Sequence, residues 1–421
     1  SRALVTAGAS NKSITVKNCL LTSTTTTYTT TNNAVVYMNT GDNSHWKFTN
    51  NTIMRGSYGI LFKAPSGNLA DSNVFTQNRF RHQRSYGAVI TNQKDIQFER
   101  NNIFSNTTYP SGIAFSFEAN FGGSYKNNYI EGRTHFPKEG MKFDGIGGTL
   151  NNMTQVSNNR IYMPANASTN ALSIIDNLFV AYTFNSIYKS GTNSTNRGIN
   201  INGPGYVSLK NNNVQVRNAG IAIRIAGSSV AECDFNNLSV PDSTGRVGWI
   251  NGTAHDSINH WQTASGFDAN SLSIDSVYTD TTKLLVCTID LYAKGTPIAG
   301  ITNDFSGQAR QTTPCIGADE FMALSVLGQN LNHTLCTGDT LTLTQLYFDT
   351  VIWNNVDTNK THVFTTHGTQ QISVIGLCGT GSANFDIIAQ ETVVINDTNL
   401  CEGTSAQLTA NINNGSYLWS T

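Results

Sequence analysis

Glu118, Lys142 and Asp144 are the side chains whose types and spacing could support chemistry on a polymer substrate. Two carboxylates at a set separation can hydrolyse a glycosidic bond, and a lysine beside them could act as a general base. The three residues are too few for a calcium site, which requires six or more oxygen ligands. Charges spaced in this way are more typical of a solvated surface, and no nucleophile elbow, P-loop or zinc motif accompanies them. We therefore predict no catalytic site, no metal site and no cofactor.

The direction of these side chains follows from a recurring motif: glycine, an apolar residue, any residue and a second apolar residue. It begins at Gly59, Gly87, Gly112, Gly140, Gly198 and Gly220, and residues 171–174 hold the same place without a glycine. Such alternation is typical of a strand with one buried face. We predict one outward column of Lys63, Thr91, Ser116, Asp144, Ile175, Asn202 and Arg224, and a second of Leu61, Val89, Ala114, Lys142, Ser173, Asn200 and Ala222. Glu118 follows one step further along its strand, so Glu118 and Asp144 are the predicted outward pair of acids.

A second motif, Asn followed by any residue and an apolar residue, keeps step with the first. Its asparagines are Asn18, Asn51, Asn78, Asn101, Asn128, Asn159, Asn185, Asn212 and Asn236, and from Asn51 onward they lie 23 to 31 residues apart. One such repeat is too small to bury its apolar face alone, so the repeats must stack. A coil of this length with three short strands is typical of a right-handed parallel β-helix, which we predict over residues 1–257.

The asparagine row has a predicted physical role in this β-helix. Asn tolerates the left-handed conformation that a sharp turn requires. Asparagines stacked one coil apart, about 4.8 Å, can also hydrogen-bond to one another. We therefore expect these residues in one vertical row at a corner of the coils.

The composition favours strands and excludes several classes of function. Asn, Thr, Ser and Gly dominate the 421 residues, and these residues disfavour long helices. Charged residues make up 13% and the net charge is -1, so no basic footprint for nucleic acid is present. No apolar run is long enough to span a membrane, and residues 1–20 lack the pattern of a signal peptide. We expect the chain to be a piece of a longer protein whose targeting signals lie elsewhere.

Residues 258–321 are predicted to cap the β-helix, because its last coil exposes strand edges and apolar side chains that must be covered. They contain Asp304, Gly307 and Arg310 in a D-x-x-G-x-x-R pattern, followed by a CIGADEF tail at 315–321. This stretch resembles the closing segment of many secreted β-helix proteins of Bacteroidota.

The resemblance has two departures that bear on its chemistry. Ser306 and Cys315 stand where that family more often has Asp, so we assign no calcium to the loop. Arg310 is predicted to form a structural ion pair with Asp319 or Glu320.

Residues 322–391 are predicted to form an immunoglobulin- or PKD-like β-sandwich. Cys336, Trp353 and Cys378 lie in strand-like alternation, which is typical of an inter-sheet disulfide over a core tryptophan. The pattern restarts at Cys401 and Trp419, so residues 392–421 are predicted to begin a second, truncated repeat. The copies resemble repeats of giant Bacteroidota surface proteins, including gliding-motility adhesins exported by the type IX secretion system. That resemblance implies an extracellular, cell-surface location and partners in the outer-membrane secretion and gliding machinery.

The seven cysteines contain no CxxC metal pattern. We expect Cys336 to bond Cys378 across the sandwich and Cys287 to bond Cys315 in the cap. Cys401 is expected to lack its partner within this piece.

These patterns favour a non-enzymatic adhesin segment, in which the β-helix is a display module and the sandwich repeats form a stalk. Its partners would be surface polysaccharides or other attachment substrates. Polysaccharide lyases of this fold class resemble one another in placing a Lys or Arg base on one outward strand face, so a lyase or hydrolase is the alternative. A carbohydrate-binding module without turnover is a third hypothesis. The discriminating observation is whether the columns between Lys63 and Arg224 form a cleft of converging charges.

A basic stretch precedes Gly87. Arg79, Arg81, His82 and Arg84 are predicted to lie in the loop before that glycine, as a rim that could contact acidic sugars.

Overall fold

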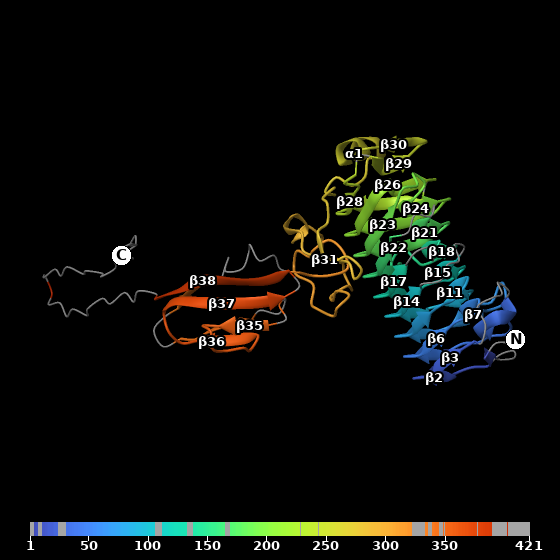
Figure 1. Ribbon diagram of the computed structural model, residues 1–421, viewed down its shortest axis with the longest axis horizontal. Coiled ribbons are helices and arrows are strands. Elements are labelled where there is room, and N and C mark those ends of the chain that lie inside the picture. Colours follow the sequence, from blue (N-terminus) through green and yellow to red (C-terminus); the bar gives the residue numbers. More distant parts are fainter. Residues whose placement is uncertain are drawn as a thin grey trace. The chain divides into compact units, whose positions relative to one another are not determined.

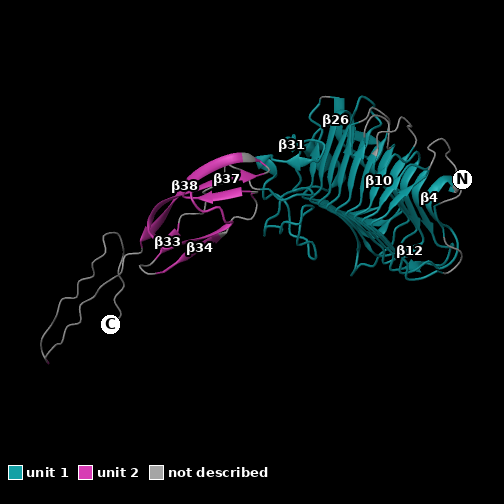
Figure 2. Cartoon of the chain, turned by 60° about the horizontal axis from the view of Figure 1, so that its bottom comes forward, with its two compact units in different colours: residues 1–321 teal, residues 322–421 magenta. Residues whose placement is uncertain are grey.

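The computed structural model describes residues 4–6, 11–23, 31–105, 112–132, 138–164, 169–227, 229–242, 244–321, 333–335, 339–344, 348, 350–376, 378–389 and 402. The chain divides into two compact units, Ser1–Phe321 and Met322–Thr421, which are coloured separately in Figure 2. Among the described helices none is long and apolar enough to cross a membrane.

The first unit is a parallel β-helix whose coils carry three stacked sheets, here called B, C and A in the order the chain visits them (Figure 1). Sheet B contains β2 (Thr15–Lys17), β5 (Lys47–Thr49), β9 (Val74–Thr76), β13 (Gln97–Glu99), β16 (Ser124–Lys126), β19 (Thr154–Ser157), β22 (Leu178–Thr183), β25 (Tyr206–Lys210) and β27 (Val230–Asp234). Sheet C contains β3 (Leu20–Thr22), β6 (Thr52–Met54), β10 (Arg79–Arg81), β14 (Asn102–Ser105), β17 (Tyr129–Gly132), β20 (Arg160–Met163), β23 (Ser186–Gly191), the first half of β26 (Asn213–Ala226) and β28 (Asn237–Ser239).

Sheet A closes each coil and is joined to sheet C through the long strand β26. It contains β1 (Val5–Thr6), β4 (Ala34–Met38), β7 (Tyr58–Lys63), β11 (Tyr86–Thr91), β15 (Ile113–Glu118), β18 (Glu139–Asp144), β21 (Asn170–Ile175), β24 (Arg197–Asn202), the second half of β26, β29 (Thr244–Ile250) and β30 (Thr253–His255). Pairing is parallel between coils, and among the described strands of sheets A, B and C only the final β29–β30 hairpin is antiparallel. Minor elements are η1 (Thr31–Asn33), β8 (Ala70–Asp71) and β12 (Gln93–Lys94).

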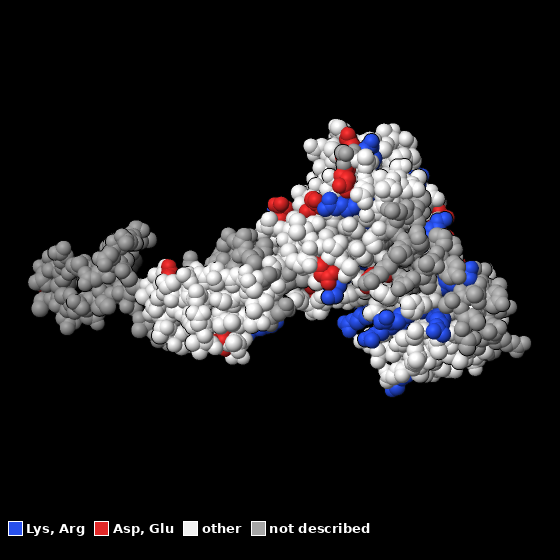
Figure 3. All heavy atoms as spheres, viewed as in Figure 1, with Lys and Arg blue, Asp and Glu red and all other residues white. Residues whose placement is uncertain are grey.

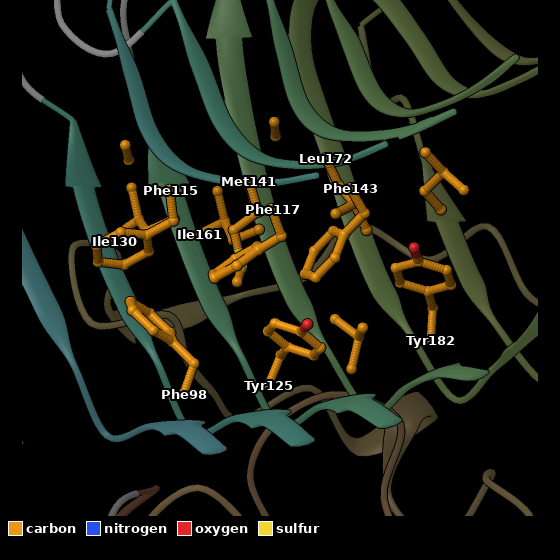
Figure 4. Close-up of a cluster of buried hydrophobic side chains, with 14 of the residues drawn as sticks. Phe98, Phe115, Phe117, Tyr125, Ile130, Met141, Phe143, Ile161, Leu172 and Tyr182 are labelled. Carbon is orange, nitrogen blue, oxygen red and sulfur yellow. The ribbon is translucent and has the colours of Figure 1, made fainter. Parts of the chain in front are cut away.

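The interior of the β-helix is filled by the inward residues of all three sheets, as the two-residue period predicts. Aromatic rings pack within and between coils: Phe117 and Phe143 of successive coils stack with centroids 5.0 Å apart, and Phe98 and Phe117 of one coil meet edge to face at 4.9 Å (Figure 4). Tyr125 and Tyr182 join them, both fully buried. Each such side chain contributes roughly 1.5–3 kcal/mol on burial, so a stack of coils is stable where one coil would not be.

The predicted asparagine row is confirmed from Asn51 to Asn236 and forms a continuous ladder at the corner between sheets B and C. Each Oδ1 accepts from the backbone N–H and the side-chain amide of the Asn one coil earlier, as Asn101 does from Asn78, both at 3.0 Å. The remaining amide hydrogen of Asn101 goes to the Phe75 carbonyl oxygen at 2.7 Å. Asn18 is the exception, because Cys19 holds the row position in the first coil and donates its N–H to Asn51.

The ladder asparagines do not themselves adopt the left-handed conformation, so that part of their predicted role is wrong. The left-handed residue of each corner is the one before the ladder Asn, at φ values such as 53° for Asn50, 54° for Arg100 and 55° for Phe184. Non-asparagine residues therefore bend the chain at several corners. The ladder position is selected by its hydrogen bonds, since a buried amide there satisfies three otherwise unpaired groups.

The end of the β-helix is covered by α1 (Ile258–Ser265). This helix starts at the N-cap Ser257 and ends at Gly266, whose φ of 71° suits a C-cap glycine. Its Trp261 is fully buried against Gly248, where an added Cβ would lie 2.0 Å from the indole. Buried Asp268 terminates the ladder: one oxygen accepts from the Asn236 amide at 3.0 Å and the other from the Trp261 indole at 2.8 Å.

The rest of the predicted cap does not cover the end. Residues 270–321, with β31 (Tyr278–Asp280), β32 (Leu285–Val286) and η2 (Ile289–Leu291), fold back along the outside of sheet C. Contacts begin at Leu272 beside Asn237 and reach the Tyr129 hydroxyl, which lies 2.9 Å from the Thr282 carbonyl oxygen. The later coils of sheet C are thus covered, whereas β6, β10 and β14 have no described segment over them.

The predicted register is wrong for two glycines of the glycine motif, Gly112 and Gly220. Ile113 pairs with Tyr86, so Ala114 lies beside Gly87 and Gly112 precedes that row by two residues. Gly220 is displaced in the same way. One outward row is therefore Lys63, Thr91, Glu118, Asp144, Ile175, Asn202 and Ala226, and its neighbour is Leu61, Val89, Ser116, Lys142, Ser173, Asn200 and Arg224. Ala114 and Ala222, predicted to face outward, are fully buried.

The second unit contains a four-stranded sheet and a two-stranded sheet. The first has the order β33 (His333–Leu335), β38 (Gly379–Ala389), β37 (Gly368–Gly376), β35 (Thr350–Trp353), and the second pairs β34 (Leu341–Thr344) with β36 (Thr361–Phe364). Both contribute to one apolar core around fully buried Trp353, whose ring lies 5.6 Å from that of Phe364. The immunoglobulin-like assignment stays a prediction, and the proposed second repeat, residues 392–421, lies outside the described residues except for Glu402.

Of the two predicted disulfide bonds, one is wrong and the other stays a prediction. Cys315 is a buried free thiol, so the Cys287–Cys315 bond is wrong. Cys287 and Cys378 are each disulfide-bonded. Cys336 and Cys401 lie outside the described residues, so the Cys336–Cys378 bond stays a prediction.

Candidate functional site

The charges predicted on sheet A do come together, but each of them already has a partner within the protein. Glu118 and Asp144 are register partners on β15 and β18, closer than the sequence register implied. The Lys142 ammonium lies 2.8 Å from the Asp144 carboxylate, and the Ser116 hydroxyl donates to Glu118 at 3.2 Å. Each candidate thus has a local partner on the same face.

The electrostatics of Lys142 do not suit a general base. Burial acts to lower its pKa, but the hydrogen bond and charge of Asp144, with Glu118 and Glu139 nearby, leave the pKa above its usual value. Lys142 is therefore protonated at neutral pH and would have to lose a proton against three carboxylates. In the described part of the chain no group of three His, Cys, Asp or Glu side chains could hold a metal ion.

The two remaining predicted charges are distant from this group. Lys63 ends β7 beside Thr91, three coils from Asp144. Arg224 lies towards the other end of the sheet, where its guanidinium is 4.4 Å from the Trp249 ring and donates to Asn200 at 3.1 Å. The sheet A charges therefore do not converge on one point.

The more distinctive surface lies on sheet C, where the predicted basic loop is in fact a strand. Arg79 and Arg81 are the outward residues of β10, on either side of buried Phe80. Exposed Arg55 follows β6, and exposed Arg100 stands at the corner before β14. We call these four residues the arginine band. Within the described residues none of the four is in an ion pair.

The surface view shows Lys and Arg atoms gathered over the early coils, in the area of β6 and β14 in Figure 1 (Figure 3). His82 lies just beyond β10 in a left-handed turn, at φ 61°. Arg84 is partly buried, and its N–H donates to the Gly56 carbonyl oxygen at 3.0 Å. Both residues therefore belong to the turn that leads from sheet C to sheet A.

A groove of about 220 Å³ lies on this face of sheet C. It is lined by Arg79, Phe80, Arg81, Asn102, Ile103, Phe104, Tyr129 and Glu131. The Arg81 guanidinium lies 5.7 Å from the Phe104 ring centroid. The Tyr129 hydroxyl is also 3.1 Å from the Glu131 carboxylate, and burial followed by the Glu131 charge raises the pKa of Tyr129, so this phenol keeps its proton. The groove therefore combines cations, ring surfaces and hydrogen-bonding groups.

A second groove of about 360 Å³ lies around the corner from the first, between sheet B and residues 270–321, which we call the returning segment. It is lined by Arg100, Lys126, Asn127, Ser157, Asn158, Gly300, Ile301, Thr302, Asn303, Asp304 and Gly307. Arg100 lines this groove and Asn102 lines the first, and only the buried ladder residue Asn101 separates them in the sequence. The two grooves therefore lie on either side of this corner.

The D-x-x-G-x-x-R loop beside the second groove is structural. Arg310 pairs with Glu320 at 2.7 Å, as predicted, and both side chains are buried. Asp319 pairs instead with Arg160, whose guanidinium lies 3.9 Å from the Phe305 ring. Asp304 accepts the backbone N–H groups of Gln308 and Glu320. The motif thus fixes the returning segment onto the coils.

The sequence does contain a signal for the arginine band. In the Asn-x-apolar motif, the residues on either side of the apolar position face outward. Asn78-Arg79-Phe80-Arg81 therefore places both arginines on the outer face of one strand. The prediction of a loop at Arg79 and Arg81 is therefore wrong, and the same motif that marks the corner indicates a strand there.

Comparison with known proteins adds little. No protein-family model matches the chain, and no curated protein matches it. Among solved structures, the crystal structure of pectate lyase Pel9A is similar with a TM-score of 0.27 and 12% identity, over 68% of this chain and 73% of that chain. So low a score and identity carry no argument for the function of this chain.

Proposed function

We propose that this chain is a non-enzymatic, extracellular attachment segment that binds polysaccharide through the outer face of its β-helix. The observation that carries the proposal is the arginine band beside a groove with aromatic and amide side chains. Such a surface supplies charge-assisted hydrogen bonds and ring faces without a convergent acid and base.

The lyase or hydrolase alternative requires a base poised near its substrate. On sheet A, Lys142 is held protonated by Asp144, and Glu118 has its own hydroxyl donor. Catalysis needs a base and a charge-stabilising group within about 3 Å of one reacting atom. The described residues of this face favour a solvated surface over that arrangement.

The ladder supports a display role. A corner in which each amide satisfies three buried groups holds the outward residues in fixed register from coil to coil. The second unit would then serve as part of a stalk, as the resemblance to gliding-motility adhesins of type IX secretion implies. Weak single-site binding suits such a molecule, because repeated copies multiply affinity.

The test is to incubate the whole chain, with and without calcium, with pectin, alginate and neutral polysaccharides. We expect retention of at least one polymer and no unsaturated products or new reducing ends. Products that disappear in Lys142→Ala or Asp144→Ala would contradict the proposal and establish the enzyme alternative.

A further inference from the structure

We propose that the arginine band holds a chain of an acidic polysaccharide, a polymer of uronic acid sugars, which crosses sheet C and bends around the corner into the second groove. This inference rests on the proposed function and names its ligand class.

The charges set the class of ligand. Arg79 and Arg81 project from one strand at positions i and i+2, about 6–7 Å apart along the backbone. Both are exposed, and neither is in an ion pair within the described residues. A guanidinium binds a carboxylate through two parallel N–H groups, so a polymer with carboxylates on successive sugars could meet both arginines.

The neighbouring residues favour a sugar as the bearer of that carboxylate. Phe104 and Tyr129 offer ring surface in the same groove, against which the C–H face of a pyranose can pack. Asn102 can donate to and accept from hydroxyl groups. Glu131 also lines the groove and can accept from sugar hydroxyls.

The corner gives the ligand its path. Because Asn101 is held inside by the ladder, Arg100 and Asn102 project on opposite sides of the B–C corner. Beyond Arg100, the second groove presents uncharged hydrogen-bonding groups, with Asn127 and Thr302 among them. A polymer that leaves the first groove at Asn102 therefore meets a further cation and then amide and hydroxyl partners.

Carboxylates beside the band argue against nucleic acid. Glu131 lines the first groove, Asp304 lines the second, and Glu99 pairs with Lys126 at 3.4 Å. A DNA backbone has no hydroxyl to donate to these carboxylates, whereas each sugar of a uronic acid polymer has hydroxyl groups that can.

The experiment measures binding of the full chain to polygalacturonate, alginate and hyaluronate, to the methyl ester of polygalacturonate, and to single-stranded DNA. The variants are R79A/R81A and R100A, with K17A/K47A as the charge-matched control, since Lys17 and Lys47 are exposed on sheet B. We expect at least one acidic polymer to bind, esterification to abolish most of its binding, and the control to bind like the parent chain. Charge-assisted hydrogen bonds predict a loss of roughly tenfold in R100A and roughly a hundredfold in R79A/R81A. Thermal melts establish that the variants are folded.

Equal losses in K17A/K47A and R79A/R81A, or no loss in R79A/R81A, would overturn the inference. DNA bound as tightly as any acidic polymer would replace it with nucleic-acid binding. Retention of neutral polysaccharide alone would refute the acidic ligand and leave the proposed function standing. Formation of cleavage products would instead refute the proposed function itself.

Discussion

Arg79 and Arg160 occupy the same outward row of sheet C, yet they have opposite surroundings. The row runs from Arg79 to Asn102, Tyr129 and Arg160. The Arg160 side chain is 7% exposed and paired with Asp319, 159 residues further along the chain, whereas Arg79 is exposed and has no ion pair among the described residues. The comparison teaches that the role of an outward residue depends on what covers it. Under the returning segment an arginine fixes the fold, and beyond it an arginine faces solvent.

The largest effect should come from the covered arginine. Arg160→Ala leaves the Asp319 carboxylate buried without its partner, which costs about 3–5 kcal/mol of unfolding free energy. Arg79→Ala is the matched control in the same row and should change stability by less than about 0.5 kcal/mol. Urea unfolding followed by tryptophan fluorescence measures both. Similar losses in the two variants would contradict the distinction between covered and open coils.

The corner below the arginine band offers a second pair of variants. Asn101→Ala removes the acceptor for two donors of Asn78 and the donor to the Phe75 carbonyl oxygen. We expect a loss of about 2–4 kcal/mol, because these groups stay buried and unpaired. Asn102→Ala alters the exposed neighbour and should weaken polysaccharide binding with little effect on stability. Denaturant midpoints and binding titrations on the same samples check both expectations, and a stable Asn101→Ala would refute the ladder's role.

Asp304 in the returning segment should make the stability of the β-helix depend on pH. This effect is expected to be smaller than those of Arg160→Ala and Asn101→Ala. Burial, then the charge of Asp319, raises the pKa of Asp304 to about 6. Because folding raises the pKa of Asp304, its protonated form stabilises the fold. This stabilisation is fully present below the unfolded pKa, near 3.8, and is lost as the pH rises through about 6. The loss is about 1–3 kcal/mol. Asp304→Asn should flatten this part of a stability profile measured from pH about 4 to 7, and an unchanged slope would contradict the assignment.

The smallest effect is expected on sheet A. Lys142 and Asp144 have side chains 22% and 36% exposed, so their ion pair contributes about 0–1 kcal/mol. Lys142→Ala should melt close to the parent chain and bind polysaccharide equally well. A large loss of binding in this variant would move the functional surface from sheet C to sheet A.

The sequence predicted the β-helix because its signals are local. Strand alternation and the asparagine row follow from the period of one coil, and both are confirmed over Asn51–Asn236. The register at Gly112 and Gly220 was wrong, because a glycine two residues early keeps the same alternation while shifting every partner. Alternation predicts which residues of a strand face outward. Which residues pair between neighbouring coils depends on the loop lengths.

The candidate site was less accessible to sequence reasoning. Glu118, Lys142 and Asp144 were correctly placed on one face, but the ion pair that holds Lys142 protonated depends on side-chain geometry. The roles of Arg79 and Arg160 could not be predicted, because no local sequence pattern indicates that residues 270–321 return along sheet C. The contacts that distinguish these arginines span more than a hundred residues.

The central claim is that the arginine band is the ligand-bearing surface of the β-helix. Arginine-selective labelling with phenylglyoxal, read by mass spectrometry with and without a bound uronic acid oligosaccharide, tests it residue by residue. We predict that Arg79, Arg81 and Arg100 are labelled in the free chain and protected by the ligand, while Arg160 is unlabelled in both states. Bound ligand that leaves the labelling of Arg79, Arg81 and Arg100 unchanged would contradict the account.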